Sequence, residues 1–158
     1  MKIEFTGEKV CLKTKKSIKK AVRICLDHLK QEHKKIMLSI AFVSEEEIKD
    51  LNQRTRNIDK VTDVLSYPNF SLKPFETIDL SNLDNYMGKF VFLGDMAICL
   101  KRAGEQAKEY GVTLMQEVIK LVIHSTLHLM GFDHIEDDDY VVMNQEEEKI
   151  ASKFYTFQ

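Results

Sequence analysis

Three histidines fall within eleven residues of this chain, in the run His124-Ser-Thr-Leu-His128-Leu-Met-Gly131-Phe-Asp-His134. On an α-helix, residues four apart differ by about 40° in azimuth and about 6 Å in rise, so His124 and His128 point at the same spot. His134 would lie about 15 Å from His124 along a continuous helix, too far to share a ligand. The helix therefore has to end before His134. Gly131 is suited to end it, because glycine adopts the left-handed conformation without steric cost.

This spacing predicts a metal site. A lone histidine on an apolar helix is usually an ordinary core or surface residue, but three at this spacing, with a glycine where the helix must end, favour one metal ion per chain on His124, His128 and His134. Three nitrogen ligands without a fourth are typical of a catalytic zinc, whose open position holds water. Nickel or another divalent ion is also compatible with these ligands. The three cysteines lie far apart and predict buried, reduced thiols rather than a disulfide or a metal site.

Apolar periodicity and capping signals predict strands interleaved with helices. Helices are expected at residues 17–30 with Ser17 as the N-cap, after the capping box at 44–47, at 99–110, from Thr113 through Met130, and at about 138–154. Strands are expected at 36–43, 61–67 and 90–93, with a long loop at 69–89. This succession indicates a single domain, residues 1–158, of the α+β or α/β class with one small sheet.

Composition and charge bear on the expected location and partners of the protein. It is 44% hydrophobic and 30% charged, and no apolar run approaches the roughly 18 to 20 residues that cross a bilayer. Because the N-terminus also lacks the pattern of a signal peptide, we expect a cytoplasmic protein with no membrane partner. Residues 9–35 carry ten bases against two acids, which fits either a polyanion-binding surface or an ordinary solvated helix face. His28 and His33, in that segment, are expected to be exposed and unrelated to the metal site.

The histidine run resembles the signature of the YbeY family, bacterial endoribonucleases that mature ribosomal RNA. Residues 51–68, LNQRTRNIDKVTDVLSYP, are similar to the LN-x-x-x-R and TDVLSFP segments of that family, and residues 93–98, LGDMAI, to its LGD segment. The resemblance spans residues 40 to 150. It implies an α+β fold with a small mixed sheet packed with helices, a zincin-like metal hydrolase whose metal-binding helix ends at Gly131.

The resemblance also implies a function. It implies a single-strand-specific, zinc-dependent endoribonuclease that acts in ribosomal RNA maturation, at the 3′ end of the small-subunit RNA, and in ribosome quality control. The implied partners are ribosomal RNA, the ribosome and its assembly factors, with no DNA. Arg56 is the implied catalytic residue that binds the scissile phosphate, since a planar guanidinium suits phosphate oxygens. By chemistry alone Arg54 is equally eligible, and Asp133 is a candidate hydrogen-bond acceptor, proton carrier or loop cap.

Ser125 is the departure from the family pattern that bears on chemistry, because the family usually has glycine there. The spacing is also similar to the H-E-x-x-H-x-x-G-x-x-H site of metzincin proteases, in which the glutamate beside the first histidine is the general base. Ser125 stands in that place without a carboxylate, so peptide hydrolysis is disfavoured, and we expect it to alter hydrogen bonding on the water side of the metal. Neutral imidazoles leave the full +2 charge on a metal, which favours an anionic substrate. The alternatives are an RNA-binding assembly factor with a mainly structural metal and a metal-dependent peptidase.

Overall fold

The computed structural model describes residues 1–81, 89–133 and 137–156. The elements follow the chain in the order β1 (Lys2–Gly7), α1 (Leu12–His28), β2 (Ile36–Val43), α2 (Glu45–Arg56), β3 (Val64–Pro68), β4 (Val91–Cys99), α3 (Leu100–Glu109), α4 (Leu114–Leu129) and α5 (Asp137–Thr156). Among the described residues these elements make one four-stranded sheet and five helices. The fold is therefore α+β with a small mixed sheet, as predicted.

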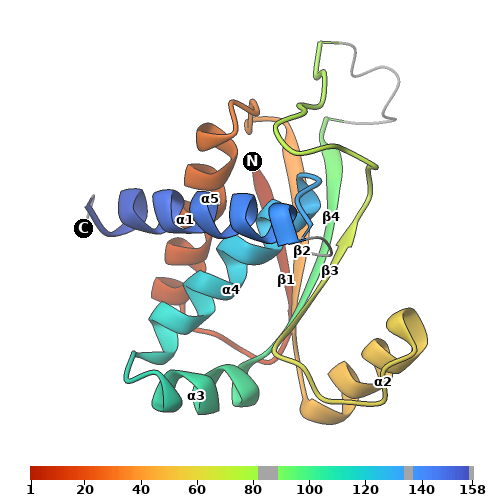
Figure 1. Cartoon of the computed structure of the whole chain (residues 1–158), viewed down its shortest axis with the longest axis vertical. Helices are drawn as coiled ribbons and strands as arrows, with labels where there is room; N and C mark the ends of the chain where they lie inside the picture. The colour runs from red at the N-terminus through yellow and green to blue at the C-terminus, as the bar shows by residue number, and fades with distance from the viewer. Residues whose placement is uncertain (82–88, 134–136, 157–158) are drawn as a thin grey trace.

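The sheet has the strand order β1-β2-β4-β3. Its first three strands are parallel to one another, and β3 pairs antiparallel with β4 at one edge. Parallel neighbours need crossover connections, which α1 supplies between β1 and β2, and α2 with β3 supplies between β2 and β4. Helices α1, α4 and α5 lie on one face of the sheet, and α2 lies on the other (Figure 1).

Two apolar layers hold these elements together. The larger lies between the sheet and helices α1, α4 and α5, and the smaller lies under α2, where Ile48 packs against Leu65, Ala97 and Cys99. Helix α4 is the most buried helix, because residues on several of its sides are in the core. Only part of its circumference is left to carry polar chemistry.

The boundaries differ from the sequence prediction where polar residues obscure the periodicity. Helix α1 begins at Leu12, so the prediction of Ser17 as its N-cap is wrong; the lysines between them are good helix formers and extend the helix. Strand β1 was not predicted, because it is a short edge strand whose residues are at most half-buried. Strand β4 continues past Gly94, where the register with β2 shifts in a bulge, instead of ending there.

The burial of the cysteines differs from the prediction at one position. Cys25 and Cys99 are buried as predicted, but Cys11 is exposed because it precedes the first turn of α1 at the surface. No helix in the described part of the chain combines the length and the apolar character needed to cross a membrane. On α5, Met143 and Ile150 are both buried and join the larger apolar layer.

Helix α4 ends in a Schellman motif at Gly131, which has φ +85°. The Gly131 N–H donates to the carbonyl of His128 at 3.1 Å, and the Phe132 N–H donates to the carbonyl of Leu127 at 3.1 Å. The loop at Leu72 approaches so closely that a Cβ atom on Gly131 would lie 2.3 Å from its carbonyl oxygen. Glycine is therefore required here both by the positive φ and by the contact with Leu72.

We expect Gly131→Ala to lower the free energy of unfolding more than Gly111→Ala does. Gly111 closes α3 with the same motif at φ +68°, but a Cβ there would meet nothing within 4 Å. Gly111→Ala should cost about 1–2 kcal/mol from the left-handed conformation alone. Gly131→Ala should cost more, because the Leu72 segment must also move. Urea denaturation of both variants measures the difference, and equal losses would show that the close approach does not matter.

Candidate functional site

His124 and His128 lie on the last two turns of α4 with their imidazoles close together. Their Nε2 atoms are 3.1 Å apart and their ring centroids 4.6 Å apart, with the ring planes at 80° to each other. The structure thus brings these two predicted ligands together, as their four-residue spacing requires. In a tetrahedral zinc site with bonds of 2.0–2.1 Å, two ligand nitrogens are about 3.3 Å apart, so the observed separation fits a shared metal ion.

The other ring nitrogen of each histidine has a hydrogen-bond acceptor beside it. Nδ1 of His124 lies 2.7 Å from Oε1 of Glu147, and Nδ1 of His128 lies 2.9 Å from the carbonyl oxygen of Phe132. A neutral imidazole with an acceptor at Nδ1 carries its proton there, which leaves the Nε2 lone pair for a metal. Two such lone pairs at 3.1 Å repel each other unless a cation lies near both, so the donor set suits a metal ion.

The third predicted ligand, His134, lies outside the described residues. Within the described ranges, no group of three His, Cys, Asp or Glu side chains is placed to hold a metal ion. The chain can be followed through the glycine-closed end of α4 to Asp133, which is exposed and lines a pocket together with His128. Metal binding by His124, His128 and His134 therefore stays a prediction, which the convergence of the first two supports.

Glu147 was not anticipated as a site residue. It belongs to α5, and its side chain is 18% exposed, beside that of His124. The acidic run at 136–148 is visible in the sequence, but which of its members faces α4 depends on how α5 crosses α4. The spacing within one helix cannot reveal a partner that a different helix supplies.

The neighbouring Glu146 ties α5 to α1. It forms ion pairs with His28 and with Lys149, the latter at 2.6 Å. Burial alone raises the pKa of the Glu146 carboxyl, but the hydrogen bonds from Lys149 and His28 outweigh it and hold that pKa below its usual value. The expectation that His28 is exposed is therefore wrong, because its ring is mostly buried between the two helices. His33 is partly exposed and pairs with Asp27 at 2.8 Å.

Arg56, at the C-terminal end of α2, shares a cleft of about 340 Å³ with His124 and His128. It also lines an adjoining pocket of about 500 Å³ with His128. It is exposed and forms no hydrogen bond or ion pair with any residue that the structure describes. Arg54, by contrast, pairs with Asp50 on the surface at 3.1 Å, away from both pockets. The geometry thus separates two arginines that chemistry alone leaves equivalent.

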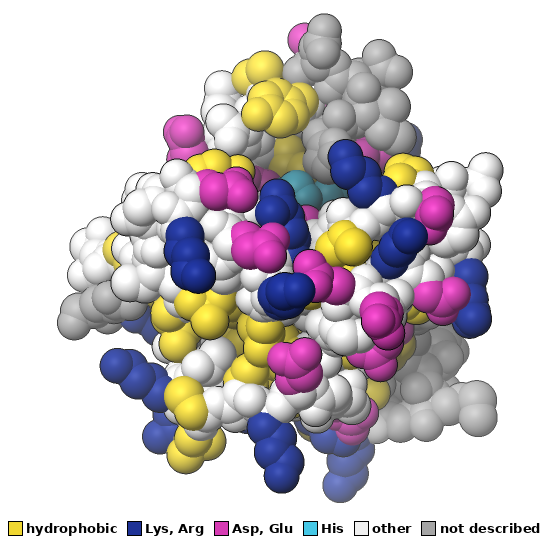
Figure 2. Space-filling model, turned by 90° about the horizontal axis from the view of Figure 1, so that it is seen from below, with side chains coloured by type: hydrophobic (Ala, Val, Ile, Leu, Met, Phe, Trp, Pro, Cys, Tyr) yellow, Lys and Arg dark blue, Asp and Glu magenta, His cyan; other side chains and the backbone are white. Residues whose placement is uncertain are grey.

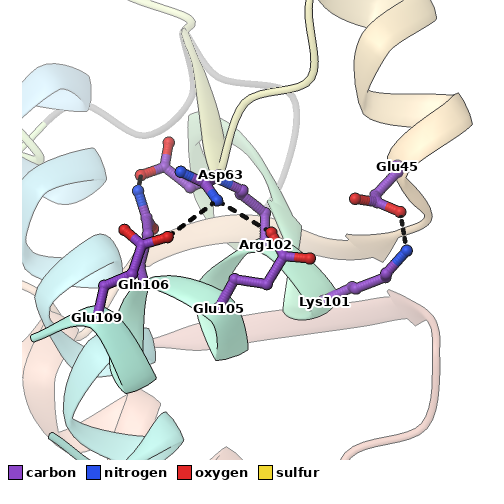
Figure 3. Close-up of polar contacts among 7 residues, drawn as sticks. All are labelled: Glu45, Asp63, Lys101, Arg102, Glu105, Gln106 and Glu109. Atoms are coloured by element: carbon purple, nitrogen blue, oxygen red, sulfur yellow. Dashed lines mark hydrogen bonds and ion pairs between the residues drawn. The ribbon is translucent and has the colours of Figure 1, made fainter. Parts of the chain in front are cut away.

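Two side chains fix the wall of the cleft between α2 and β3. The buried Asn52 donates to the carbonyl of Lys60 at 2.8 Å and so holds the loop that follows α2. Asp63 accepts from the Val64 N–H at 2.8 Å and from Nε2 of Gln106 at 3.0 Å, which fastens the same loop to α3 (Figure 3). Asn52 and Asp63 belong to the LN-x-x-x-R and TDVLS segments, and their hydrogen bonds hold the loop beside Arg56.

The structure places Ser125 behind the cleft. Its side chain is completely buried, and its hydroxyl oxygen lies 2.7 Å from that of Ser66 on β3. The expectation that Ser125 takes part in hydrogen bonding on the water side of the metal is therefore wrong, because it faces the strand rather than the space in front of the histidines. A glutamate in the same orientation would also point away from that space.

We expect Glu147→Ala to weaken zinc binding by about 10–100-fold, as loss of a carboxylate that orients a ligating histidine does. The variant removes the acceptor at Nδ1 of His124 but leaves the predicted ligands in place. Competition with a chromophoric chelator measures the dissociation constant. Glu148→Ala, at an exposed neighbouring position on α5, is the matched control and should bind zinc like the unaltered protein. Equal affinities of the two variants would contradict the role of Glu147.

Comparison with known proteins gives one consistent family. The family model described as Endoribonuclease YbeY matches residues 2–155. Proteins named Endoribonuclease YbeY from Clostridium botulinum (strain Hall) and Clostridium acetobutylicum are 37% identical over 155 residues and 42% identical over 148 residues, respectively. The alignments cover 90% of this chain and 92% of the C. botulinum protein, and 87% of this chain and 89% of the C. acetobutylicum protein.

A solved structure agrees with the sequence comparisons. The solution structure of TM1509 from Thermotoga maritima is similar with a TM-score of 0.62 and 28% sequence identity, over 98% of this chain and 89% of that one. The family is metal-dependent, which fits the paired histidines at the end of α4. The chain belongs to the YbeY family and is an endoribonuclease, an enzyme that hydrolyses phosphodiester bonds in RNA.

Proposed function

We propose that this protein is a zinc-dependent, single-strand-specific endoribonuclease that acts in ribosomal RNA maturation, at the 3′ end of the small-subunit RNA, and in ribosome quality control. The observation that carries this proposal is the shared cleft of His124, His128 and Arg56. Two converging imidazoles next to a cationic fork form a site for an anion. The relation to the YbeY family supports the ribosomal substrate and, with it, a cytoplasmic location with the ribosome and its assembly factors as partners.

His124 and His128, together with His134, are the residues that would hold the metal ion. When bound, zinc supplies a +2 charge that polarises a phosphoryl oxygen and lowers the pKa of water to about 7. Glu147 and the carbonyl of Phe132 keep the Nδ1 protons of the two described histidines in place, so that both Nε2 atoms face the cleft. Nickel or another divalent ion would use the same nitrogen donors.

Arg56 binds the scissile phosphate in this proposal. Its guanidinium donates two parallel hydrogen bonds to non-bridging oxygens, and these bonds strengthen as negative charge gathers there in the transition state. Because no described residue pairs with Arg56, binding a phosphate breaks no existing ion pair with those residues. Its position at the last turn of α2, next to the loop held by Asn52, gives it a fixed base from which to reach the substrate.

The shape of the site favours a single strand. Figure 2 shows histidine side chains recessed in a hollow, with lysine, arginine and acidic side chains around it. A flexible strand can bend its backbone into such a hollow and turn its bases to either side, whereas the stacked bases of a duplex cannot separate without a cost in free energy. The two pockets that meet at Arg56 and His128 provide space on both sides of a bound phosphate.

Removal of the metal should abolish RNA cleavage. We expect the purified protein to cut a single-stranded RNA oligonucleotide, to lose that activity in a chelator and to regain it when zinc is added back. His128→Ala should lose at least about a hundredfold in rate, because it removes a proposed ligand. His33→Ala, at a surface ion pair far from α4 in sequence, is the control and should cleave normally. Undiminished cleavage in chelator would contradict the metal-dependent mechanism.

Arg56→Ala should lower kcat/KM for RNA about thirtyfold, which corresponds to about 2 kcal/mol of transition-state stabilisation. Arg54→Ala removes the same charge from the same helix but only breaks a surface pair with Asp50, and should change the rate by less than about twofold. Arg56→Lys should recover part of the loss, since an ammonium keeps the charge without the bidentate geometry. Zinc content measured in parallel should be equal in all three variants, and a larger effect of Arg54→Ala would reverse the assignment.

A further inference from the structure

A carboxylate with no evident structural role lies in the cleft beyond the histidines. Glu117, in the first turns of α4, is 3% exposed and lines the same cleft as His124. It forms no hydrogen bond or ion pair with any residue that the structure describes. Burial raises the pKa of its carboxyl, an effect that nearby Lys120 only partly offsets. Burying an acidic group without donors costs stability, so the Glu117 carboxylate is a group that a ligand with N–H donors would stabilise.

Gln106, on α3, lines the same cleft as Glu117. Nε2 of Gln106 donates to Asp63 at 3.0 Å, which fixes the orientation of the amide (Figure 3). Oε1 of Gln106 is buried and has no hydrogen-bond partner among the described residues. Gln106 lines the cleft, but this oxygen lies beneath its surface, so the acceptor that the inner cleft offers to a ligand is the carboxylate of Glu117.

The cleft also supplies one donor and one aromatic ring. Lys120 lies one turn after Glu117 on the same face of α4, and its Nζ is 5.0 Å from the centroid of the Tyr110 ring. The Tyr110 side chain is mostly exposed and lines the same cleft. Tyrosine rings at such walls are stacking surfaces for bases of single-stranded nucleic acid.

Glu117 and Lys120 lie along one stripe of α4 with His124 and His128. His124 follows Glu117 by seven residues, which is two turns and about 10 Å along the helix. A phosphate held at His124 and Arg56 therefore leaves a neighbouring nucleoside free to extend along α4 towards Glu117. The inner cleft is thus placed to contact a base and not the reacting phosphate.

The pattern of one donor and two acceptors selects among the bases. Guanine presents O6 as an acceptor next to N1–H and N2–H₂ as donors, which is the complement of the Lys120 ammonium and the two carboxylate oxygens of Glu117. Adenine offers one donor group beside an acceptor on that edge, uracil one donor between two acceptors, and cytosine one donor group with two acceptors. Guanine is the base that satisfies both carboxylate oxygens of Glu117 and the ammonium together.

We propose that Glu117 and Lys120 form a guanine-binding subsite that selects the nucleotide next to the cleaved bond. This proposal rests on the proposed function, because it assumes that RNA occupies the cleft. The two carboxylate oxygens of Glu117 accept from N1–H and N2–H₂, and Lys120 donates to O6. Glu117 is here a specificity residue, too far along α4 to touch the reacting atoms.

Binding of mononucleotides tests the subsite without relying on cleavage. Titration calorimetry of the zinc-loaded protein with guanosine, inosine and adenosine 5′-monophosphates compares ligands that share one phosphate and sugar. We expect the guanosine nucleotide to bind about tenfold more tightly than the adenosine nucleotide, with the inosine nucleotide between them because it lacks the N2 amino group. Equal affinities for all three would overturn the proposal.

Two variants test which side chains read the base. Glu117→Gln is isosteric and removes a charge that burial disfavours, so it should fold and reduce the guanosine-to-adenosine ratio to below about twofold. Lys120→Ala, on the surface, should lower the same ratio by a smaller factor. Glu109→Gln makes the same charge change at an exposed position of α3 that pairs with Arg102, and should keep the full ratio. A ratio that persists in both Glu117→Gln and Lys120→Ala would overturn the subsite.

Cleavage assays separate this proposal from the one on which it rests. Single-stranded oligonucleotides with a single guanosine in an otherwise guanosine-free sequence should be cut beside it, and Glu117→Gln should spread the cuts to other positions while it retains cleavage of mixed sequences. Cleavage without base preference in the unaltered protein would refute the subsite and leave the endoribonuclease proposal intact. Selective binding of the guanosine nucleotide without any RNA cleavage would support the subsite and contradict the endoribonuclease proposal.

Discussion

The burial of α4 is the constraint on which the site depends. This helix packs against α1, α3, α5 and the sheet, so ten of its sixteen residues are buried, and seven of those ten are apolar. The 3.6-residue period leaves one stripe for the cleft, which carries Glu117, Lys120, His124 and His128. Because the rest of the helix is fixed by packing, the positions of these polar groups are fixed as well. The proposed metal ligands and the proposed base-selecting residues thus share one rigid element.

Groups from other elements also line the site, and different contacts hold each of them in place. Glu147 reaches His124 because α5 crosses α4, and α5 is itself held to α1 by the ion pair between Glu146 and His28. Arg56 reaches the cleft because α2 ends there and Asn52 binds the loop that follows. A change in the packing of α1 or α2 is therefore expected to move a partner of the site, although neither helix carries one of the histidines.

Sequence reasoning succeeded where one element alone decides the outcome. The capping boxes at Ser44 and Thr113, and the end of α4 at Gly131, follow from local hydrogen bonding and backbone conformation, and all three are observed. The convergence of His124 and His128 follows from helical geometry in the same way. The contact of Glu147 with His124, and the presence of Arg56 rather than Arg54 in the cleft, depend on how different elements pack together. Periodicity cannot reveal the first, and only the family resemblance indicated the second. The inner cleft of Glu117 and Gln106 was missed for the same reason, since it forms between α3 and α4.

The contact between Ser66 and Ser125 bears on the difference between this site and the metzincin pattern. Two small hydroxyl side chains meet at 2.7 Å between β3 and α4, with Ser125 completely buried. A glutamate at that position, as in the metzincin pattern, would place a carboxylate between the helix and the strand and force them apart. His124 and His128 would then move away from the β3 wall of the cleft. The packing that brings α4 close to β3 therefore disfavours the general base of a metzincin protease, and in the proposed mechanism the neutral imidazoles and Arg56 attract an anionic substrate.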